Sequence, residues 1–350
     1  MRPPLPEADL DFVLAHTRPF WQQFAGARVF VTGGTGFIGA WLLEAFQHAN
    51  RHLAADMELV ALSRNPDHAR AMAPHLFNDA SIQLTSGDVS QFTPPAGHFD
   101  LCIHAAADVG DSAKAGQHVE IFNSSVTGTR RVLDFALASG ARRFLLTSSG
   151  AVYGVQPPDL VRMPETYVGA PDPLNVSAAY GNGKRAAEWL CAEAASRSDL
   201  EAVSARIFAL VGPGLPLNGP FAAGNFIRDL LAGQQIKVGG DGRPVRSYLY
   251  AADACVWLLA ILQSGASGQA YNVGAEQGLS IMELAREMTK AGGANLQQPG
   301  IPPTSATATT APRYVPDTAK ARQELGLKVW TPLDIALQKT LEWNRHAMNA

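Results

Sequence analysis

The stretch VFVTGGTGFIGAWLLEAF, residues 29–46, decides the fold class of this sequence. A short run of β-branched and aromatic residues leads into three spaced glycines, and an amphipathic helical pattern follows them. Backbone N–H groups in such a turn can approach a pyrophosphate, and the start of the helix adds partial positive charge. Because strand, glycines and helix occur in this order, the stretch predicts a dinucleotide-binding turn. The residues expected to line the cofactor here are Gly33, Thr35, Gly36, Phe37, Ile38 and Gly39.

Outward from this turn, short apolar runs alternate with helical patterns as far as residue 208. Such alternation predicts an α/β fold, here a Rossmann-type doubly wound parallel sheet with helices on both faces. The expected strands are RVFVT (28–32), ELVALS (58–63), SIQLTS (81–86), LCIHAA (101–106), RFLLTSS (143–149) and EAVSARIF (201–208).

Beyond residue 208 a loop rich in glycine and proline, VGPGLPLNGPFAAGN (211–225), precedes shorter elements. This change predicts a smaller C-terminal α/β part that closes a cleft over the first domain. We expect an N-terminal extension (1–27) anchored by aromatic residues, a dinucleotide-binding domain (28–208), and a mainly substrate-binding part (209–350) that can return segments to the first domain. The segment PPTSATATTAPRYVP (302–316) is expected to be an extended surface strap.

The composition indicates a soluble globular protein, because 47% of the 350 residues are hydrophobic and 17% are charged. A net charge of −3 argues against a nucleic-acid partner. The three cysteines, Cys102, Cys191 and Cys255, lie far apart in apolar runs, which predicts buried free thiols in a reducing compartment. No secretory signal and no run of 18 apolar residues is found, so we expect a cytoplasmic protein with no membrane partner.

The end of the second expected strand bears on which dinucleotide is bound. An acidic residue there would hold the ribose hydroxyls of NAD, but this chain has Ser63 and Arg64. A guanidinium suits a 2′-phosphate, so NADP is slightly favoured over NAD. The alternative is an exposed arginine in a polar turn. Further cofactor contacts are expected from the residues after the third and fourth strands, which are Asp88, Val89, Ala105, Ala106 and Ala107.

The segment SAAYGNGKRAAEWL (177–190) places Tyr180 and Lys184 four residues apart at the start of a predicted helix. This spacing puts both side chains on one face, where an ammonium can lower the pKa of the tyrosine. The pair is common by chance, and a core tyrosine beside a solvated lysine is the alternative. Its position after the fifth strand of a glycine-turn domain favours a catalytic pair.

The ordered motifs TGGTGFIG (32–39), HAAA (104–107), TSSGAVYG (147–154), YGNGK (180–184) and GGDGRPVRSYLYAAD (239–253) carry a family resemblance. Over roughly residues 28–345 the chain resembles the extended short-chain dehydrogenase/reductases. More narrowly, it is similar to the NAD-dependent epimerase/dehydratase family, which modifies nucleotide sugars.

The resemblance implies a catalytic set of Ser149, Tyr180 and Lys184. Ser149 would hold the reacting sugar oxygen, Tyr180 would be its general acid/base, and Lys184 would tune Tyr180 and bind the nicotinamide ribose. Arg246 would contact the diphosphate of the substrate. The expected substrate-binding residues are Ser148, Ser149, Gly150, Asn225 and Arg246. The resemblance also implies a homodimer joined through a four-helix bundle, here with helices near residues 119–137 and 179–195.

The chain departs from the family pattern at four positions. Sugar 4,6-dehydratases carry an Asp-Glu pair where this chain has Gly150 and Ala151, and the nucleotide-sugar decarboxylases keep the glutamate. Neither Gly150 nor Ala151 can transfer a proton, which disfavours elimination and decarboxylation. Ala209 and Ser125 stand where many relatives have asparagine, so the pocket is expected to differ from that of UDP-galactose 4-epimerases.

Together these features favour an NAD(P)-dependent nucleotide-sugar epimerase or 4-ketoreductase that transfers a hydride between a sugar carbon, most often C4, and nicotinamide. One alternative is an NADP-dependent reductase of a small hydrophobic ketone, against which Arg246 argues. The other is an NADP-binding regulatory protein without turnover, and the retained Tyr180 and Lys184 argue against it.

Overall fold

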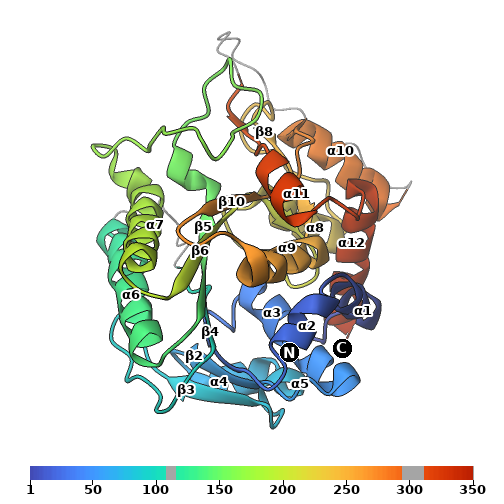
Figure 1. Cartoon of the computed structure of the whole chain (residues 1–350). Coiled ribbons are helices and arrows are strands. Elements are labelled where there is room, and N and C mark those ends of the chain that lie inside the picture. Colours follow the sequence, from blue (N-terminus) through green and yellow to red (C-terminus); the bar gives the residue numbers. More distant parts are fainter. Residues whose placement is uncertain (108–115, 294–310, 350) are drawn as a thin grey trace.

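A seven-stranded parallel sheet forms the centre of the computed structural model, which describes residues 1–107, 116–293 and 311–349 (Figure 1). The strand order β10-β6-β5-β4-β1-β2-β3 is that of a doubly wound fold, which confirms the predicted fold class. Its strands are β1 Arg28–Thr32, β2 Glu58–Ser63, β3 Ile82–Ser86, β4 Leu101–His104, β5 Arg143–Ser149, β6 Glu201–Ile207 and β10 Ala270–Val273.

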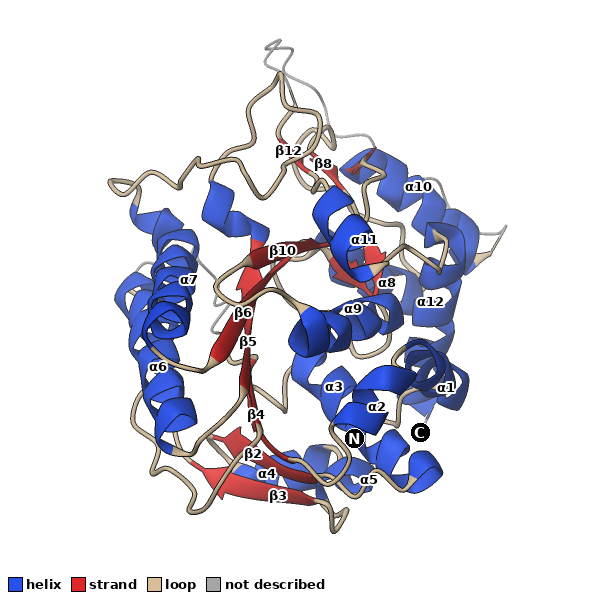
Figure 2. Ribbon diagram, in the orientation of Figure 1, coloured by secondary structure: helices blue, strands red, loops and turns tan. Residues whose placement is uncertain are grey.

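Helices cover both faces of this sheet (Figure 2). α6 (His118–Ala138) and α7 (Ala179–Arg197) lie on one face, and α3 (Phe37–Leu53) and α9 (Ala251–Ser264) on the other. Successive side chains of β1 alternate between the two cores, because Val29 and Val31 pack toward α3 and α9 whereas Phe30 packs toward α6. Burial on both faces explains why the strands are continuous apolar runs.

The chain after residue 208 both completes this sheet and builds a second layer above it. β10 pairs in parallel with β6, and the remaining strands form two small sheets, β11-β8-β12 and β7-β9. The strands are β7 Leu210–Val211, β8 Val245–Arg246, β9 Leu249–Tyr250, β11 Leu279–Ser280 and β12 Arg313–Tyr314. The helices are α8 Ala222–Leu231, α10 Ile281–Gly292, α11 Ala319–Leu325 and α12 Leu333–Asn349.

Residues 302–310 of the expected surface strap lie outside the described ranges, and the described residues 311–316 differ from the expectation. Arg313 and Tyr314 form β12, which pairs in parallel with β8. The next residue, Val315, is 1% exposed, and its backbone N–H donates to the Gln156 side chain. This end of the segment is therefore a paired, half-buried edge strand and not a free strap, because β8 lies on one side of it and Gln156 and Met163 bind the residue that follows it on the other.

The N-terminal extension packs on the body through its aromatic residues, as predicted. Phe20, Trp21 and Phe24 are each at most 2% exposed, and the rings of Phe20 and Trp21 contact Phe46 of α3. The buried Asp9 carboxylate accepts a 2.6 Å hydrogen bond from Tyr250 and pairs with Lys339. The helices of the extension are α1 Glu7–His16 and α2 Arg18–Gln23. Two further short helices, α4 Pro66–Met72 and α5 Pro74–Phe77, lie between β2 and β3 in the chain.

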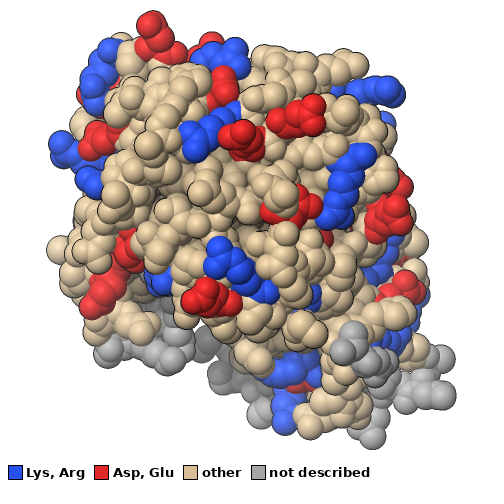
Figure 3. Space-filling model, turned by 90° about the horizontal axis from the view of Figure 1, so that it is seen from below, with Lys and Arg blue, Asp and Glu red and all other residues tan. Residues whose placement is uncertain are grey.

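The surface and the thiols agree with the composition. Acidic and basic side chains are interspersed over the face drawn in Figure 3. All three cysteines are free and buried, as predicted. Within the described ranges, no helix combines the length and the apolar character that crossing a bilayer requires.

Candidate active site

The glycine turn between β1 and α3 is shaped by two close backbone contacts. Gly33 has a φ of +72°, and a Cβ there would lie 2.4 Å from the carbonyl carbon of Ala105. A Cβ on Gly39 would lie 2.2 Å from the Gly33 oxygen. Gly39 thus lets α3 pack on the turn itself. Gly36 caps α3 without any side-chain hydrogen bond, so backbone N–H groups of the first turn point to an anion site that fits a dinucleotide phosphate.

The other predicted cofactor residues lie at the ends of β2, β3 and β4. Ser63 ends β2 and Arg64 is exposed just beyond it. Asp88 accepts hydrogen bonds from the backbone and hydroxyl of Ser90, which lower the pKa of its carboxyl, and the charge of Arg64 lowers it further. The half-buried residues that follow β4 are Ala105, Ala106 and Ala107.

Val89, another predicted cofactor residue, directs its side chain to a different place. It is 8% exposed and packs against Gly128 of α6, where an added Cβ would lie 2.9 Å from its Cγ1. Its side chain therefore belongs to the core on the α6 side of the sheet, so the predicted contact with the cofactor would come from its backbone.

The three predicted catalytic residues come together where β5 meets α7. The Lys184 ammonium is 1% exposed and donates a 2.8 Å hydrogen bond to the Thr147 carbonyl of β5. Its nitrogen lies 6.0 Å from the ring centroid of Tyr180. The Ser149 hydroxyl lies close enough to the Tyr180 phenol to act on its pKa, and the Ser149 side chain is also buried. The strand end and the first turn of the helix therefore hold two hydroxyls and one ammonium in a single group.

Burial dominates the electrostatics of this group. It raises the pKa of the Tyr180 phenol, which the hydrogen bond with Ser149 opposes. It also lowers the pKa of Lys184 to about 8. Neighbouring His104, at the end of β4, has its pKa lowered to about 3 by burial and by the charge of Lys184. It is held between the hydroxyls of Thr32 and Thr129, so both ring nitrogens have hydrogen-bond partners within the fold.

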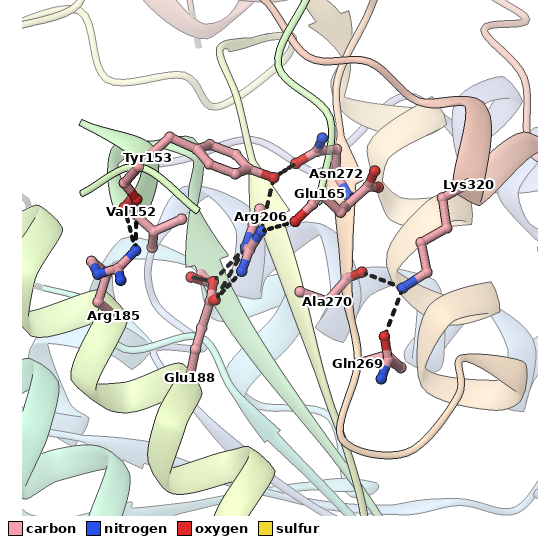
Figure 4. Close-up of polar contacts among 12 residues, drawn as sticks. Val152, Tyr153, Glu165, Arg185, Glu188, Arg206, Gln269, Ala270, Asn272 and Lys320 are labelled. Atoms are coloured by element: carbon pink, nitrogen blue, oxygen red, sulfur yellow. Dashed lines mark hydrogen bonds and ion pairs between the residues drawn. The ribbon is translucent and has the colours of Figure 1, made fainter. Parts of the chain in front are cut away.

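Ser148, predicted to contact substrate, lies on the opposite side of β5 from Ser149. The two serines point to opposite faces because neighbouring residues of a strand alternate. The Ser148 hydroxyl donates a 2.5 Å hydrogen bond to Glu188 of α7. Glu188 in turn pairs with Arg206, which donates to the Tyr153 hydroxyl at 2.9 Å (Figure 4). Tyr153 donates to Asn272 of β10 at 2.8 Å. The network thus joins strands β6 and β10 to α7, and Tyr153 has a structural role in it.

Gly150 borders a residue that the sequence analysis did not select. A Cβ at position 150 would lie 2.7 Å from the Tyr314 hydroxyl and 2.7 Å from Cζ of Phe208. The Tyr314 hydroxyl is 3.4 Å from the Ser149 hydroxyl oxygen, and the Arg246 guanidinium carbon lies 5.6 Å from the Tyr314 ring centroid. Tyr314 therefore joins the serine to the predicted diphosphate-binding arginine.

The remaining predicted or atypical residues are held by local contacts. Asn225 of α8 donates to the Gly219 carbonyl at 3.1 Å and accepts from Arg228 at 3.1 Å. Ser125 of α6 donates to the Ile121 carbonyl and faces Gly183 of α7, where an added Cβ would lie 2.9 Å from the serine Cβ. A small residue at position 125 thus suits the close packing of α6 on α7.

Comparison with known proteins agrees with this geometry. Residues 29–274 match the model described as the NAD dependent epimerase/dehydratase family. The chain belongs to this family. The similar proteins match this chain over most of its length.

Three of these similar proteins illustrate the range. UDP-glucuronic acid decarboxylase 1 of Xenopus tropicalis is 29% identical over 319 residues, covering 91% of this chain and 72% of that protein. MoeE5, solved in complex with UDP-glucose and NAD, is 26% identical with a TM-score of 0.73, covering 92% of this chain and 99% of that one. DesIV, a dTDP-glucose 4,6-dehydratase from Streptomyces venezuelae solved with NAD, is 23% identical with a TM-score of 0.76, covering 92% and 98%, and shows the same fold.

The crowding at Gly150 predicts a stability cost for any side chain there. In Gly150→Ala the new methyl group must displace Phe208 or Tyr314, which lowers the free energy of unfolding by about 1–3 kcal/mol. Gly239→Ala is the matched control, because nothing lies within 4 Å of a Cβ at that exposed position. Thermal unfolding of both variants measures the difference, and a Gly150→Ala variant as stable as Gly239→Ala would contradict the packing.

Proposed function

We propose that this protein is an NAD(P)-dependent nucleotide-sugar epimerase or 4-ketoreductase. The observation that carries the proposal is the group of Ser149, Tyr180 and Lys184 beside the glycine turn. His104 links the two, since its strand follows β1 in the sheet and its carbonyl accepts a 3.2 Å hydrogen bond from Thr147. In an open α/β sheet, ligands bind at this carboxyl edge.

The chain's own residues perform the proton chemistry in this proposal. A bound nicotinamide dinucleotide supplies the acceptor, and in the reverse direction the donor, of a hydride. Ser149 holds the oxygen of the reacting sugar carbon, and Tyr180 removes its proton as the carbon is oxidised. On reduction Tyr180 returns that proton. The nearby Lys184 ammonium favours the tyrosinate that this role requires.

A nucleoside-diphosphate sugar is the proposed substrate. A diphosphate calls for a guanidinium, and Arg246 lies next to the catalytic group through Tyr314. MoeE5, 26% identical, was solved with UDP-glucose, which supports the same ligand class. A small uncharged ketone would need no arginine, and a purely regulatory protein would need neither Tyr180 nor Lys184.

Decarboxylation of a nucleotide-linked uronic acid is the second candidate, because the Xenopus relative is named a UDP-glucuronic acid decarboxylase. Oxidation at C4 of a uronic acid creates a β-keto acid, which loses carbon dioxide, so the first step would be shared. Gly150 and Ala151 supply no side chain that could move a proton in the later steps, and this favours epimerisation or reduction.

The proposed function is tested by a panel of nucleotide sugars. Purified protein is incubated with oxidised NAD or NADP and with UDP-, dTDP-, GDP- and CDP-linked hexoses and UDP-glucuronate, or with NADH or NADPH and the 4-keto forms of these sugars, and the products are separated by chromatography. Conversion at C4 supports an epimerase, and cofactor consumption with a 4-keto sugar supports a reductase. Release of carbon dioxide would favour the second candidate. Failure to bind any of the four nucleoside diphosphates would overturn the substrate class.

NADP preference is proposed on the basis of Arg64. Replacing Arg64 by serine removes a charge-assisted contact to a 2′-phosphate, so NADP should bind roughly ten- to a hundredfold more weakly while NAD binding changes little. Arg70→Ser is the matched control, because Arg70 is exposed nearby on α4 and pairs with Asp67. Calorimetric titration measures both cofactors, and an equal loss of NAD and NADP affinity would contradict the proposed role.

A homodimer through α6 and α7 is also proposed. Three large apolar side chains on these helices are exposed, namely Val119 (68%), Phe122 (38%) and Trp189 (67%). Such side chains on two packed helices suit a four-helix interface with a second copy.

A further inference from the structure

The Tyr314 hydroxyl lies where a side chain at position 150 would begin, 2.7 Å from a Cβ built on Gly150. Its ring packs on Phe208 with 4.5 Å between centroids. Residue 314 is 165 positions from Ser149 and reaches it through the pairing of β12 with β8. The space that an acid would need is therefore filled by a phenol.

Hydrogen-bond capacity decides what Tyr314 does to Ser149. The serine oxygen accepts a 3.2 Å bond from the backbone N–H of Ala151. A hydroxyl has two acceptor sites and one proton, so a second bond donated by Tyr314 would fill both acceptor sites. Ser149 is then left as a donor only, directed at an oxygen of Tyr180 or of a substrate.

Tyr314 has two acceptors within reach, both at long distances. Its hydroxyl lies 3.4 Å from the Ser149 oxygen and 3.5 Å from the Ile207 carbonyl. Usual O–H···O distances end near 3.0 Å. A small movement of the Tyr314 ring therefore decides whether its hydroxyl donates a hydrogen bond to the Ser149 oxygen or to the Ile207 carbonyl of β6.

Arg246 is placed to make that selection. It stands opposite Tyr314 in the β8–β12 pair, and its guanidinium carbon lies 5.6 Å from the Tyr314 ring centroid. A diphosphate bound to Arg246 would keep the guanidinium against the Tyr314 ring, and this would limit the movement of the ring. Occupation of the diphosphate site is thereby coupled to the orientation of the serine proton.

We propose that Tyr314 is a positioning residue, which donates to Ser149 when Arg246 is engaged and so makes Ser149 an obligate donor to the sugar oxygen. This inference rests on the proposed function. It assigns to the C-terminal part a role in the chemistry besides substrate binding.

The test is a double-mutant cycle of Tyr314→Phe and Ser149→Ala. Phenylalanine keeps the packing on Phe208 and removes only the hydroxyl. Tyr314→Phe should lower kcat roughly three- to tenfold, the worth of one hydrogen bond, with KM within about twofold. In the Ser149→Ala background the same change should have no further effect, because the residue acts through the serine. Thermal unfolding reports whether each variant is folded.

Tyr271→Phe is the control for loss of a tyrosine hydroxyl, because Tyr271 of β10 is bonded to Glu324 and Ala266, away from this group. It should leave kcat unchanged. An equal loss from Tyr314→Phe in both backgrounds, or no loss in the wild-type background, would overturn the inference alone. A wild-type protein that converts no nucleotide sugar would overturn the proposed function and this inference together.

Discussion

Replacing Tyr180 by phenylalanine is expected to lower kcat by about 10²–10⁴-fold while the protein stays folded and still binds NAD(P). The phenol is the only group in the catalytic set that can both remove and return the proton of the sugar hydroxyl. Phenylalanine keeps the ring beside Lys184 and removes only the phenol oxygen, whose pKa Ser149 lowers. Steady-state kinetics on the best sugar of the panel measures the loss, and cofactor titration checks binding.

Tyr153→Phe is the matched control for this prediction. The Tyr153 hydroxyl is buried and bonded to Arg206 and Asn272, so its removal should reduce stability and leave kcat within a few-fold. The assignment of Tyr180 fails if Tyr180→Phe retains wild-type activity. That outcome, with NADP binding intact, is the one expected of a regulatory protein without turnover.

Replacing Lys184 by methionine is expected to lower kcat by roughly 10²-fold or more, because the tyrosinate then loses the nearby positive charge. Methionine fills a similar volume in a site where the ammonium is 1% exposed. Losing the bond to the Thr147 carbonyl costs stability, and removing a buried charge restores it, so the unfolding temperature should change little. A variant that is inactive because it is unfolded would show instead a large drop in that temperature.

The pH dependence of the wild-type protein provides an independent check on Lys184. Burial lowers its pKa to about 8, so the ammonium is present below pH 8 and is lost as the pH rises through that value. Activity should therefore decline above about pH 8 as one proton is lost. In the unfolded chain the lysine titrates near 10.4, so the unfolded state holds more protons between about pH 8 and 10. Over that interval the contribution of Lys184 to stability therefore rises while the activity falls. If Lys184→Met kept some activity and that activity showed the same decline above pH 8, the decline would not come from Lys184.

Much of the catalytic group could be predicted because it is local in the sequence. The glycine turn joins a strand to the helix that follows it, and Tyr180 and Lys184 share one turn of α7. Their spacing alone places them on one face. Ser149 was selected through the family resemblance, and the structure places it at the end of β5, at the carboxyl edge of the sheet. The distinction between Ser149 and Ser148 needed the structure, since a shift of one residue moves a side chain to the opposite face of the strand.

Tyr314 could not be found in this way. Residues 302–316 are low in complexity, and nothing in their composition distinguishes a paired edge strand from an exposed strap. The deciding contact is the pairing of β12 with β8, which joins residues 313–314 to residues 245–246. Residues that meet through long-range strand pairing leave no spacing pattern in the sequence. The packing of the N-terminal extension on α3 and α9 could likewise be predicted only in part, from its aromatic residues.

The sequence by itself determined the doubly wound fold and the glycine turn, because the alternation of strands and helices and the strand–glycine–helix order are local patterns along the chain. The resemblance to a known family added the expected set of Ser149, Tyr180 and Lys184. Only the tertiary structure decided which serine faces the tyrosine, that Val89 belongs to the core, and that Tyr314 and Phe208 fill the space above Gly150. The physical reason is that local motifs follow from backbone geometry along the chain, whereas the walls of the pocket come from segments that meet only when the sheet and its second layer have packed.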